Sequence, residues 1–175
     1  MIAIIGESGS GKTTILNELV KRGFEQAINH TTRLRRENEK ENSEYKFMTK
    51  REFNILWEEN KLLQKAEFGN EYYGISVDSL KGNVACILNV DAIIDVKEKV
   101  KELGLESLKL KTFYIKVPQE IRRKRMLMRG ESEEWLEKRE KLDKQQFVDS
   151  EKIVDYIVEN IDLQKAVNDI IKYYE

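Results

Sequence analysis

The sequence of 175 residues is poor in cysteine, histidine and proline. It contains one cysteine, Cys86, one histidine and one proline, Pro118. A single cysteine excludes a disulfide within the chain, and one cysteine with one histidine cannot form a Cys/His metal cluster. Cys86 lies in the apolar run at 84–88, which predicts a buried thiol. Without a proline-rich or low-complexity stretch, the chain shows no linker that would divide it.

The sequence also lacks an excess of one charge and a long apolar segment. Lys plus Arg number 31 and Asp plus Glu number 32, so the formal net charge is −1. This balance argues against a nucleic-acid polymer as partner. No apolar run approaches the roughly 18 residues of a membrane-spanning helix, and no signal peptide precedes the first strand. We therefore expect a cytoplasmic protein with no membrane partner, and the length suits one domain.

Short apolar strands alternate with amphipathic helices along the chain. Strands are expected at 2–5, 62–68, 71–74, 84–90, 111–117 and 154–159. Helices are expected at 12–22, after the capping box at 49–52, and at 92–103, 119–128, 133–147 and 162–174. This alternation predicts an α/β fold with a mainly parallel sheet flanked by helices.

The most informative motif follows the first strand. Residues 6–13 read GESGSGKT, which matches G-x-x-x-x-G-K-[ST] between an apolar strand and an amphipathic helix. Its glycines permit a backbone that turns successive N–H groups toward phosphates, and the helix N-terminus adds positive potential. Lys12 is expected to reach the β- and γ-phosphates, and the Thr13 hydroxyl to bind Mg²⁺. The residues expected to bind ATP here are Gly6, Glu7, Ser8, Gly9, Ser10, Gly11, Lys12, Thr13 and Thr14.

Two further segments are rich in arginine. Residues 31–36 read TTRLRR and are followed by Tyr45, a set of hydroxyls and guanidinium groups that suits a second phosphate; the alternative is a solvated charge run. Arg122, Arg125 and Arg129 share one helix face before Gly130, which suits a lid that closes over a triphosphate. The alternative for this second segment is an exposed basic helix, or one paired with Glu133, Glu134 and Glu137.

Together these segments resemble the guanylate kinases along nearly the full length. The similar stretches are GESGSGKTT, HTTRLRRENEKENSEYKF, FGNEYYG, ILNVD, RKRMLMRG and VENIDL. The resemblance implies conversion of GMP and dGMP to their diphosphates with ATP and Mg²⁺, in a P-loop three-layer fold. It also implies a core at 1–32, 76–127 and 141–175, an acceptor-binding subdomain at about 33–75, and a lid at about 128–140.

The same resemblance assigns roles to individual residues. Arg33, Arg36 and Tyr45 would hold the acceptor phosphate with help from Tyr73, Asp91 would lie near the acceptor base, and Asn160 near the ATP adenine. Arg122 or Arg125, with Arg129 and Arg139, would neutralise the transferring phosphoryl group. The resulting catalytic set is Lys12, Arg125, Arg129 and Arg139, and the acceptor-binding set is Asn29, Arg33, Arg36, Tyr45, Gln64, Tyr73, Ser76 and Asp91.

The departures from the family pattern concern base recognition. Gln64 stands where the family has a glutamate, Asn29 where it has a serine, and Ile75 where it has Ser or Thr, although Ser76 is adjacent. A carboxylate accepts both guanine donors, N1–H and the 2-amino group, whereas an amide offers one acceptor oxygen. A mismatched buried contact costs about 1–3 kcal/mol. Glu67 could substitute, but strand alternation would place it on the opposite face from Gln64.

Three functions therefore stay open. A nucleoside monophosphate kinase acting on GMP or dGMP is the first. A kinase of the same fold with another acceptor, either a different nucleoside monophosphate or a phosphorylated sugar, is the second. A non-catalytic binding module is the third, and Lys12 with Thr13 counts against it because such a module needs neither. The oligomeric state is expected to be monomer or homodimer.

Overall fold

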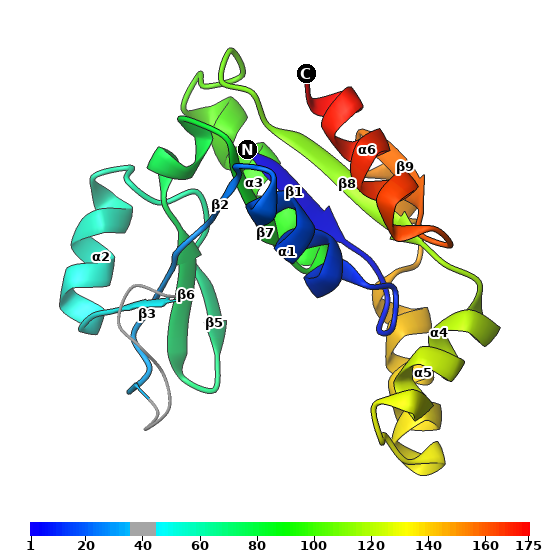
Figure 1. Ribbon diagram of the computed structural model, residues 1–175. Coiled ribbons are helices and arrows are strands. Elements are labelled where there is room, and N and C mark those ends of the chain that lie inside the picture. Colours follow the sequence, from blue (N-terminus) through cyan, green and yellow to red (C-terminus); the bar gives the residue numbers. More distant parts are fainter. Residues whose placement is uncertain (36–44) are drawn as a thin grey trace.

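The computed structural model describes residues 1–35 and 45–175 (Figure 1). The elements are, in chain order, β1 (Ile2–Ile5), α1 (Lys12–Lys21), β2 (Glu25–Gln26), β3 (Asn29–Thr31), β4 (Tyr45–Phe47), α2 (Lys50–Glu58), β5 (Ala66–Phe68), β6 (Glu71–Ile75), η1 (Val77–Leu80), β7 (Val84–Ile87), α3 (Val90–Glu102), β8 (Lys111–Lys116), α4 (Gln119–Met128), α5 (Glu133–Gln146), η2 (Ser150–Lys152), β9 (Tyr156–Glu159) and α6 (Leu163–Tyr174). Arg36, which was expected to hold the acceptor phosphate, lies outside the described residues.

The core is a parallel five-stranded sheet with the order β2-β7-β1-β8-β9. The central strand β1 is buried on both sides. Ile2 and Ile4 pack into a cluster with α1 and α6, whereas Ala3 and Ile5 pack into a second cluster with α3. Burial on both faces explains why β1 is continuously apolar rather than alternating. This arrangement confirms the predicted α/β three-layer fold.

A second sheet, with the order β4-β3-β6-β5, lies beside the core together with α2 (Figure 1). β3 pairs in parallel with β4 and antiparallel with β6. The helix α2 begins at the predicted capping box, in which Thr49 and Glu52 hydrogen-bond to each other's backbone N–H groups. Phe53 of α2 is fully buried, and its ring centroid lies 5.6 Å from that of Tyr72 in β6. Apart from β3, which lies in the expected core segment 1–32, the elements of this smaller unit lie in the segment at 33–75 that was expected to bind the acceptor.

Several predicted strands are shorter in the structure. The strand expected at 62–68 is wrong over its first half, because β5 begins at Ala66 and Leu62 forms only an isolated bridge with Ser76. The strand expected at 84–90 ends at Ile87, because the Asn89 side chain accepts a hydrogen bond from the Ala92 N–H and caps α3. Because Asn89 caps α3 and Val90 is the first residue of that helix, the apolar residues Leu88 and Val90 do not extend the strand.

Two predictions from composition can also be compared with the structure. Cys86 is buried, as expected, and its burial raises the pKa of the thiol to about 12. Across the part of the chain that the structure describes, we find no helix with the length and apolar character needed to cross a membrane.

The helices α4 and α5 follow β8 and project from one end of the core (Figure 1). Between them, Arg129 and Gly130 end the first helix, and the Ser132 side chain caps the second. An ion pair between Arg123 and Glu140 at 3.2 Å joins the two helices. α5 also lies beside the loop between β1 and α1, because its residues Arg139 and Asp143 contact Ser8.

Candidate active site

The loop between β1 and α1 can form only with glycine at two of its positions. Gly9 and Gly11 have φ angles of 76° and 88°, in the left-handed region. A Cβ atom at Gly9 would lie 2.8 Å from the Arg122 carbonyl oxygen, and one at Gly11 would lie 2.4 Å from Asn160 Nδ2. The loop is therefore packed tightly between α4 and the segment after β9, and the motif's glycines are required by both conformation and space.

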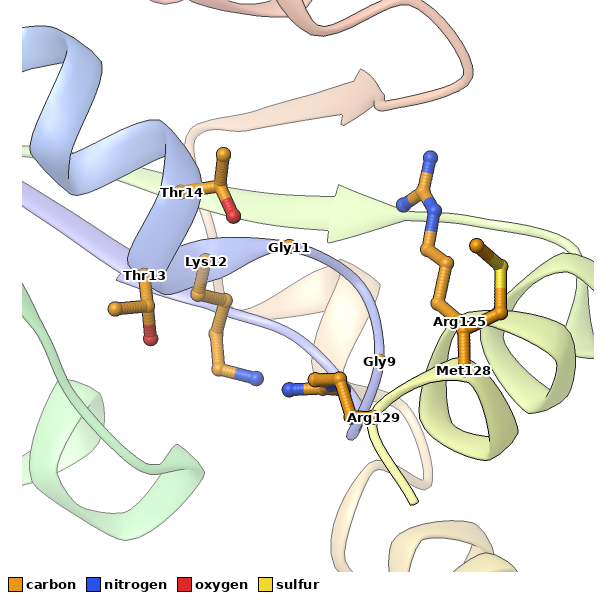
Figure 2. A pocket seen from close by; sticks show the side chains of 8 residues that line it. All are labelled: Gly9, Gly11, Lys12, Thr13, Thr14, Arg125, Met128 and Arg129. Carbon is orange, nitrogen blue, oxygen red and sulfur yellow. The ribbon is translucent and has the colours of Figure 1, made fainter. Parts of the chain in front are cut away.

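A cavity of about 460 Å³ opens over this loop (Figure 2). Its lining residues are Gly9, Gly11, Lys12, Thr13, Thr14, Arg125, Met128 and Arg129. Lys12 Nζ donates hydrogen bonds to the carbonyl oxygens of Gly6 at 2.6 Å and Glu7 at 3.0 Å. Burial lowers the pKa of Lys12 to about 8, while the nearby Asp143 carboxylate acts in the opposite direction. The cavity thus brings together a partly buried lysine and a threonine, the residues that the motif predicted for phosphate and Mg²⁺.

Three arginines predicted to be catalytic surround the loop. Arg125 donates a hydrogen bond to the Asn160 carbonyl oxygen at 2.8 Å, and Arg129 follows α4 with a side chain that is 60% exposed. Arg139, from α5, donates from Nε to the Ser8 hydroxyl at 2.6 Å. The structure therefore brings all three arginines to the loop, although they come from different places in the sequence.

Arg122 behaves differently from its neighbours on α4. Its side chain is 7% exposed, and Nη2 forms an ion pair with Glu7 at 3.0 Å. Because Glu7 neutralises the Arg122 guanidinium, the arginines of α4 need no bound anion to offset their mutual repulsion. The argument for a lid that was based on that repulsion is therefore weaker. Of the alternative partners weighed for the basic segment, Glu133 forms an ion pair with Arg123.

Asn160 was expected near the adenine and lies behind the loop. It is 2% exposed, and its Nδ2 donates a hydrogen bond to the Ser10 carbonyl oxygen at 2.7 Å. Its own Oδ1 is buried without a hydrogen-bond partner in the described structure. The contact with Ser10 shows that Asn160 supports the loop, and its role toward adenine stays a prediction.

A second cavity of about 390 Å³ lies between the small sheet and the core. It is lined by Asn29, Tyr45, Gln64, Ala66, Phe68, Tyr73, Gly74, Ile87, Leu88, Asn89 and Ala92. Four of the residues expected to bind the acceptor are among them: Asn29, Tyr45, Gln64 and Tyr73. The Arg33 guanidinium lies 4.9 Å from the centroid of the Tyr45 ring, so a fifth is adjacent.

Two other expected acceptor residues lie apart from this lining. The Ser76 hydroxyl accepts a hydrogen bond from the Asp78 N–H and caps η1. Asp91 is exposed in the first turn of α3.

The sequence reasoning missed Asp95, whose Oδ2 lies 3.4 Å from Gln64 Nε2. Asp95 follows Ala92 by three residues on α3, so the helical period from a cavity-lining residue is the signal that could have found it.

A third cavity of about 340 Å³ lies between the first two. It shares Thr13 with the cavity over the loop, and it shares Asn29, Tyr45 and Ile87 with the cavity beside the small sheet. The third cavity therefore borders Thr13 of the phosphate-binding loop on one side and the expected acceptor residues Asn29 and Tyr45 on the other.

Magnesium fits the donor side of this arrangement only together with a phosphate ligand. Thr13 lines the cavity over the loop, beside Lys12. No group of three or more His, Cys, Asp or Glu residues that could hold a metal ion occurs at 1–35 or 45–175. Because Mg²⁺ prefers six oxygen ligands, phosphate oxygens and water would have to complete the shell around the Thr13 hydroxyl.

Comparison with known proteins gives one consistent result. The family model described as guanylate kinase matches residues 1–175. A guanylate kinase of Buchnera aphidicola subsp. Schizaphis graminum is 30% identical over 178 residues, covering 97% of this chain and 84% of that protein. A guanylate kinase of Shouchella clausii is 30% identical over 177 residues, again covering 97% and 84%.

A solved structure has the same fold. The crystal structure of guanylate kinase from Anaplasma phagocytophilum matches with a TM-score of 0.60 and 22% identity, covering 99% of this chain and 84% of that chain. At this identity the match supports the fold, independently of the sequence matches.

Proposed function

We propose, because this chain belongs to the guanylate kinase family, that it transfers the γ-phosphoryl group of ATP to GMP or dGMP. Membership makes the chain a nucleoside monophosphate kinase and a phosphotransferase. The observation that supports the finer proposal is the third cavity, whose lining includes Thr13 of a complete phosphate-binding loop and both Asn29 and Tyr45 of the predicted acceptor cavity.

The donor is held by the loop. The backbone N–H groups around Gly9 and Gly11, the Lys12 ammonium and the helix N-terminus at Lys12 would bind the triphosphate. Thr13 would hold Mg²⁺, which supplies charge neutralisation at the β- and γ-phosphates when bound. Arg125, Arg129 and Arg139 would neutralise the rest of the charge on the transferring group, since phosphoryl transfer is catalysed mainly by positioning and electrostatics.

The acceptor is held on the other side. Arg33 and Tyr45 would bind its phosphate, with Tyr73 beside them and Asn29 and Gln64 toward the base. A phosphate oxygen of the acceptor attacks the γ-phosphorus, the bond to the β–γ bridging oxygen breaks, and ADP leaves. The chain's residues fix the two phosphates in line and exclude water from the space between them.

A different acceptor base is the second candidate, and a specific residue favours it. Gln64 is 7% exposed and lines the acceptor cavity where the family has a glutamate. An amide with one acceptor oxygen and two N–H donors pairs with the donor and acceptor edge of adenine, as glutamine does in DNA recognition. The residues proposed to bind the acceptor phosphate, Arg33 and Tyr45, would serve a guanine or an adenine nucleotide equally.

An acceptor panel tests the proposal. ADP release is followed with ATP, Mg²⁺ and each nucleoside monophosphate in its ribo and deoxy forms. The proposal predicts the highest kcat/KM with GMP and dGMP. A higher kcat/KM with AMP than with GMP would establish the second candidate. If no acceptor in the panel led to release of ADP, both candidates would be overturned.

A further inference from the structure

We propose that Asp143 is a positioning residue that ties Arg139 to the phosphate-binding loop. The inference rests on the proposed function, because it concerns how a predicted catalytic arginine is held. It assigns a role to a buried carboxylate on α5 that neither the loop motif nor the arginine-rich segments indicate.

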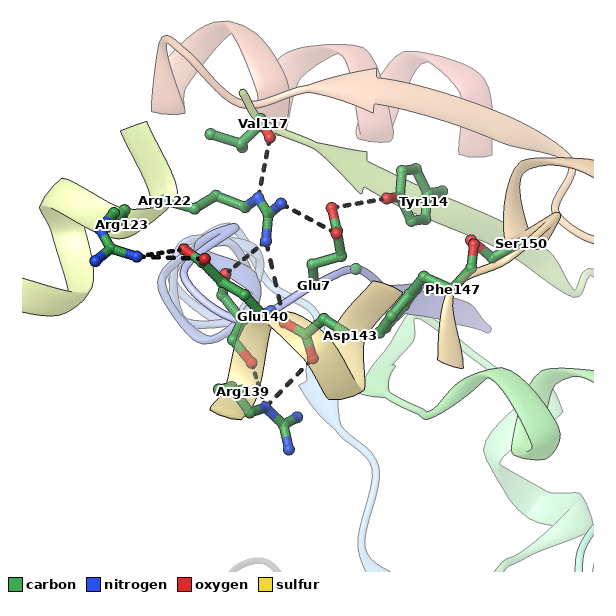
Figure 3. A network of polar contacts seen from close by, with 12 residues as sticks. Glu7, Tyr114, Val117, Arg122, Arg123, Arg139, Glu140, Asp143, Phe147 and Ser150 are labelled. Carbon is green, nitrogen blue, oxygen red and sulfur yellow. Dashed lines mark hydrogen bonds and ion pairs between the residues drawn. The ribbon is translucent and has the colours of Figure 1, made fainter. Parts of the chain in front are cut away.

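The loop has two sides with different surroundings. Gly9, Gly11 and Lys12 line the cavity over the loop. Glu7 contacts Arg122 of α4 (Figure 3). Ser8 contacts Arg139 and Asp143 of α5. The first side is available to a ligand, whereas the second is fixed to the helices. Groups on the second side can therefore control the loop without touching the phosphates.

Asp143 closes a triangle of short contacts on this second side. Its Oδ2 accepts a hydrogen bond from the Ser8 backbone N–H at 2.7 Å, and its Oδ1 lies 3.3 Å from Arg139 Nε. The same Arg139 Nε donates to the Ser8 hydroxyl at 2.6 Å. One carboxylate thus holds both the loop residue and the arginine that contacts it, which fixes where Arg139 stands relative to the loop.

The surroundings of Asp143 suit a permanent anchor. Its side chain is 1% exposed and lies near the end of α5, one turn after Arg139. Arg122 lies 4.0 Å away and is itself paired with Glu7. A buried carboxylate is costly unless hydrogen bonds and opposite charges surround it. Here the Ser8 N–H donates to Oδ2 and the guanidinium groups of Arg139 and Arg122 supply opposite charge, whereas Oδ1 has no hydrogen-bond partner among the described residues. A group held in this way stays in place rather than leaving when a phosphate arrives.

The expected consequence is in the rate of transfer. An arginine side chain has many rotamers, and an ion pair with a fixed carboxylate reduces the number it samples. Stabilising charge in the transition state requires the guanidinium to be in place before the reaction. Loss of the Asp143 charge should therefore lower kcat more than it raises the KM for ATP, because Lys12 and the loop N–H groups still bind the nucleotide.

The test substitutes the carboxylate by its amide. Asp143→Asn keeps an oxygen that can accept from the Ser8 N–H but removes the charge that holds Arg139. We expect kcat to fall by about tenfold or more, with the KM for ATP within about threefold of the unsubstituted protein. In an Arg139→Ala background the same substitution should have no further effect on kcat, because its target is gone.

A matched control lies on the same helix. Glu140→Gln removes the ion pair with Arg123, which joins the same two helices and makes no contact with the loop. It should leave kcat within about twofold, as expected for a partly exposed pair. Circular dichroism and thermal unfolding check that each variant is folded. If Asp143→Asn does not fold, Ser8→Ala is tested instead, because it removes the hydroxyl to which Arg139 donates. It should lower kcat in the unsubstituted background and have no further effect on kcat in the Arg139→Ala background.

Three results would overturn the inference. The first is an Asp143→Asn protein with unchanged kcat, the second an equal loss in Glu140→Gln, and the third a full further loss in the Arg139→Ala background. Each of these requires an active unsubstituted protein. A protein that forms no ADP with any nucleoside monophosphate would instead overturn the proposed function, and the role of Asp143 with it.

Discussion

At the scale of single residues, Gln64 is the side chain expected to matter most for recognition of the acceptor base. It lines the acceptor cavity, and its Nε2 lies 3.4 Å from the carboxylate of Asp95. That contact uses one N–H of the amide and leaves Oε1 and the other N–H for a ligand. Glu67, considered as a substitute, is exposed on β5. Glu67 therefore does not replace Gln64 in the lining of the acceptor cavity.

A carboxylate at this position should improve the use of GMP. Gln64→Glu is predicted to raise kcat/KM for GMP by about 1–3 kcal/mol of transition-state stabilisation, because both guanine donors then find an acceptor. Asp95 would repel the new charge, so the gain should be larger in Gln64→Glu with Asp95→Asn. Kinetics with GMP and AMP measure this, and AMP should not benefit from either change. A kcat/KM for GMP that is unchanged or lower in both variants would contradict the prediction.

The loop residues were predictable, whereas the residues around them were not. Gly9, Gly11, Lys12 and Thr13 are contiguous in a motif whose spacing carries its own chemistry. Asp143 is 135 residues from Ser8, its hydrogen-bond partner. No periodicity in the sequence relates two positions so far apart, and only the packing of α5 against the loop brings them together.

At the scale of elements, α4 and α5 supply the arginines that are predicted to close over the donor. Arg125 and Arg129 reach the cavity from α4 and its end, and Arg139 reaches the loop from α5. Gly130, between the helices, has a φ of 87° and no atom within 4 Å of the place of a Cβ. The junction therefore combines a left-handed backbone with open space, as a hinge requires.

Hydrogen exchange should detect closure of this segment. Backbone amides at 128–140 are predicted to exchange more slowly when ATP, Mg²⁺ and GMP analogues occupy both cavities, because Arg129 and its neighbours then contact phosphates. Amides near Asp143 should change less, since α5 already contacts the loop there. Equal exchange of 128–140 with and without ligands would mean that the two helices are static.

The elements differ in how well the sequence predicted them. The helix expected at 119–128 has the bounds of α4, because Pro118 precedes its first residue and Gly130 follows its end. The strands β2, β3 and β4 were missed. Each has two or three residues, too few to show alternation, and each is defined by pairing with a partner strand rather than by its own pattern.

At the scale of the whole molecule, a polar contact ties the last strands of the core together. Asp155 precedes β9 and accepts hydrogen bonds from the Thr112 N–H and hydroxyl, both at 2.7 Å. Lys97, from α3, lies 2.9 Å from the same carboxylate group. Burial alone would raise the pKa of Asp155, but the hydrogen bonds from Lys97 and Thr112 outweigh it and lower the pKa.

This contact predicts a pH dependence of stability. Because the pKa of Asp155 is lower in the folded state, the carboxylate stabilises the fold above its unfolded pKa of about 3.9, and the contribution is lost as the pH falls through the folded value. Asp155→Asn should lower the free energy of unfolding at pH 7 by about 1 kcal/mol, because the side chain is 34% exposed and solvent screens its charge. Urea denaturation at pH 7 and at pH 3 measures both proteins. A difference that does not shrink at pH 3 would contradict this assignment.

The measurement that tests the central claim most directly is the stoichiometry of transfer. The protein is incubated with ATP, Mg²⁺ and GMP, and ADP and GDP are separated and quantified together. One GDP is predicted for each ADP, and a folded Lys12→Ala protein should form both at a rate lower by orders of magnitude, because Lys12 lines the donor cavity and would bind the transferring phosphate. ADP formed without GDP, or near-normal turnover by Lys12→Ala, would contradict the claim that the two cavities form one phosphoryl-transfer site.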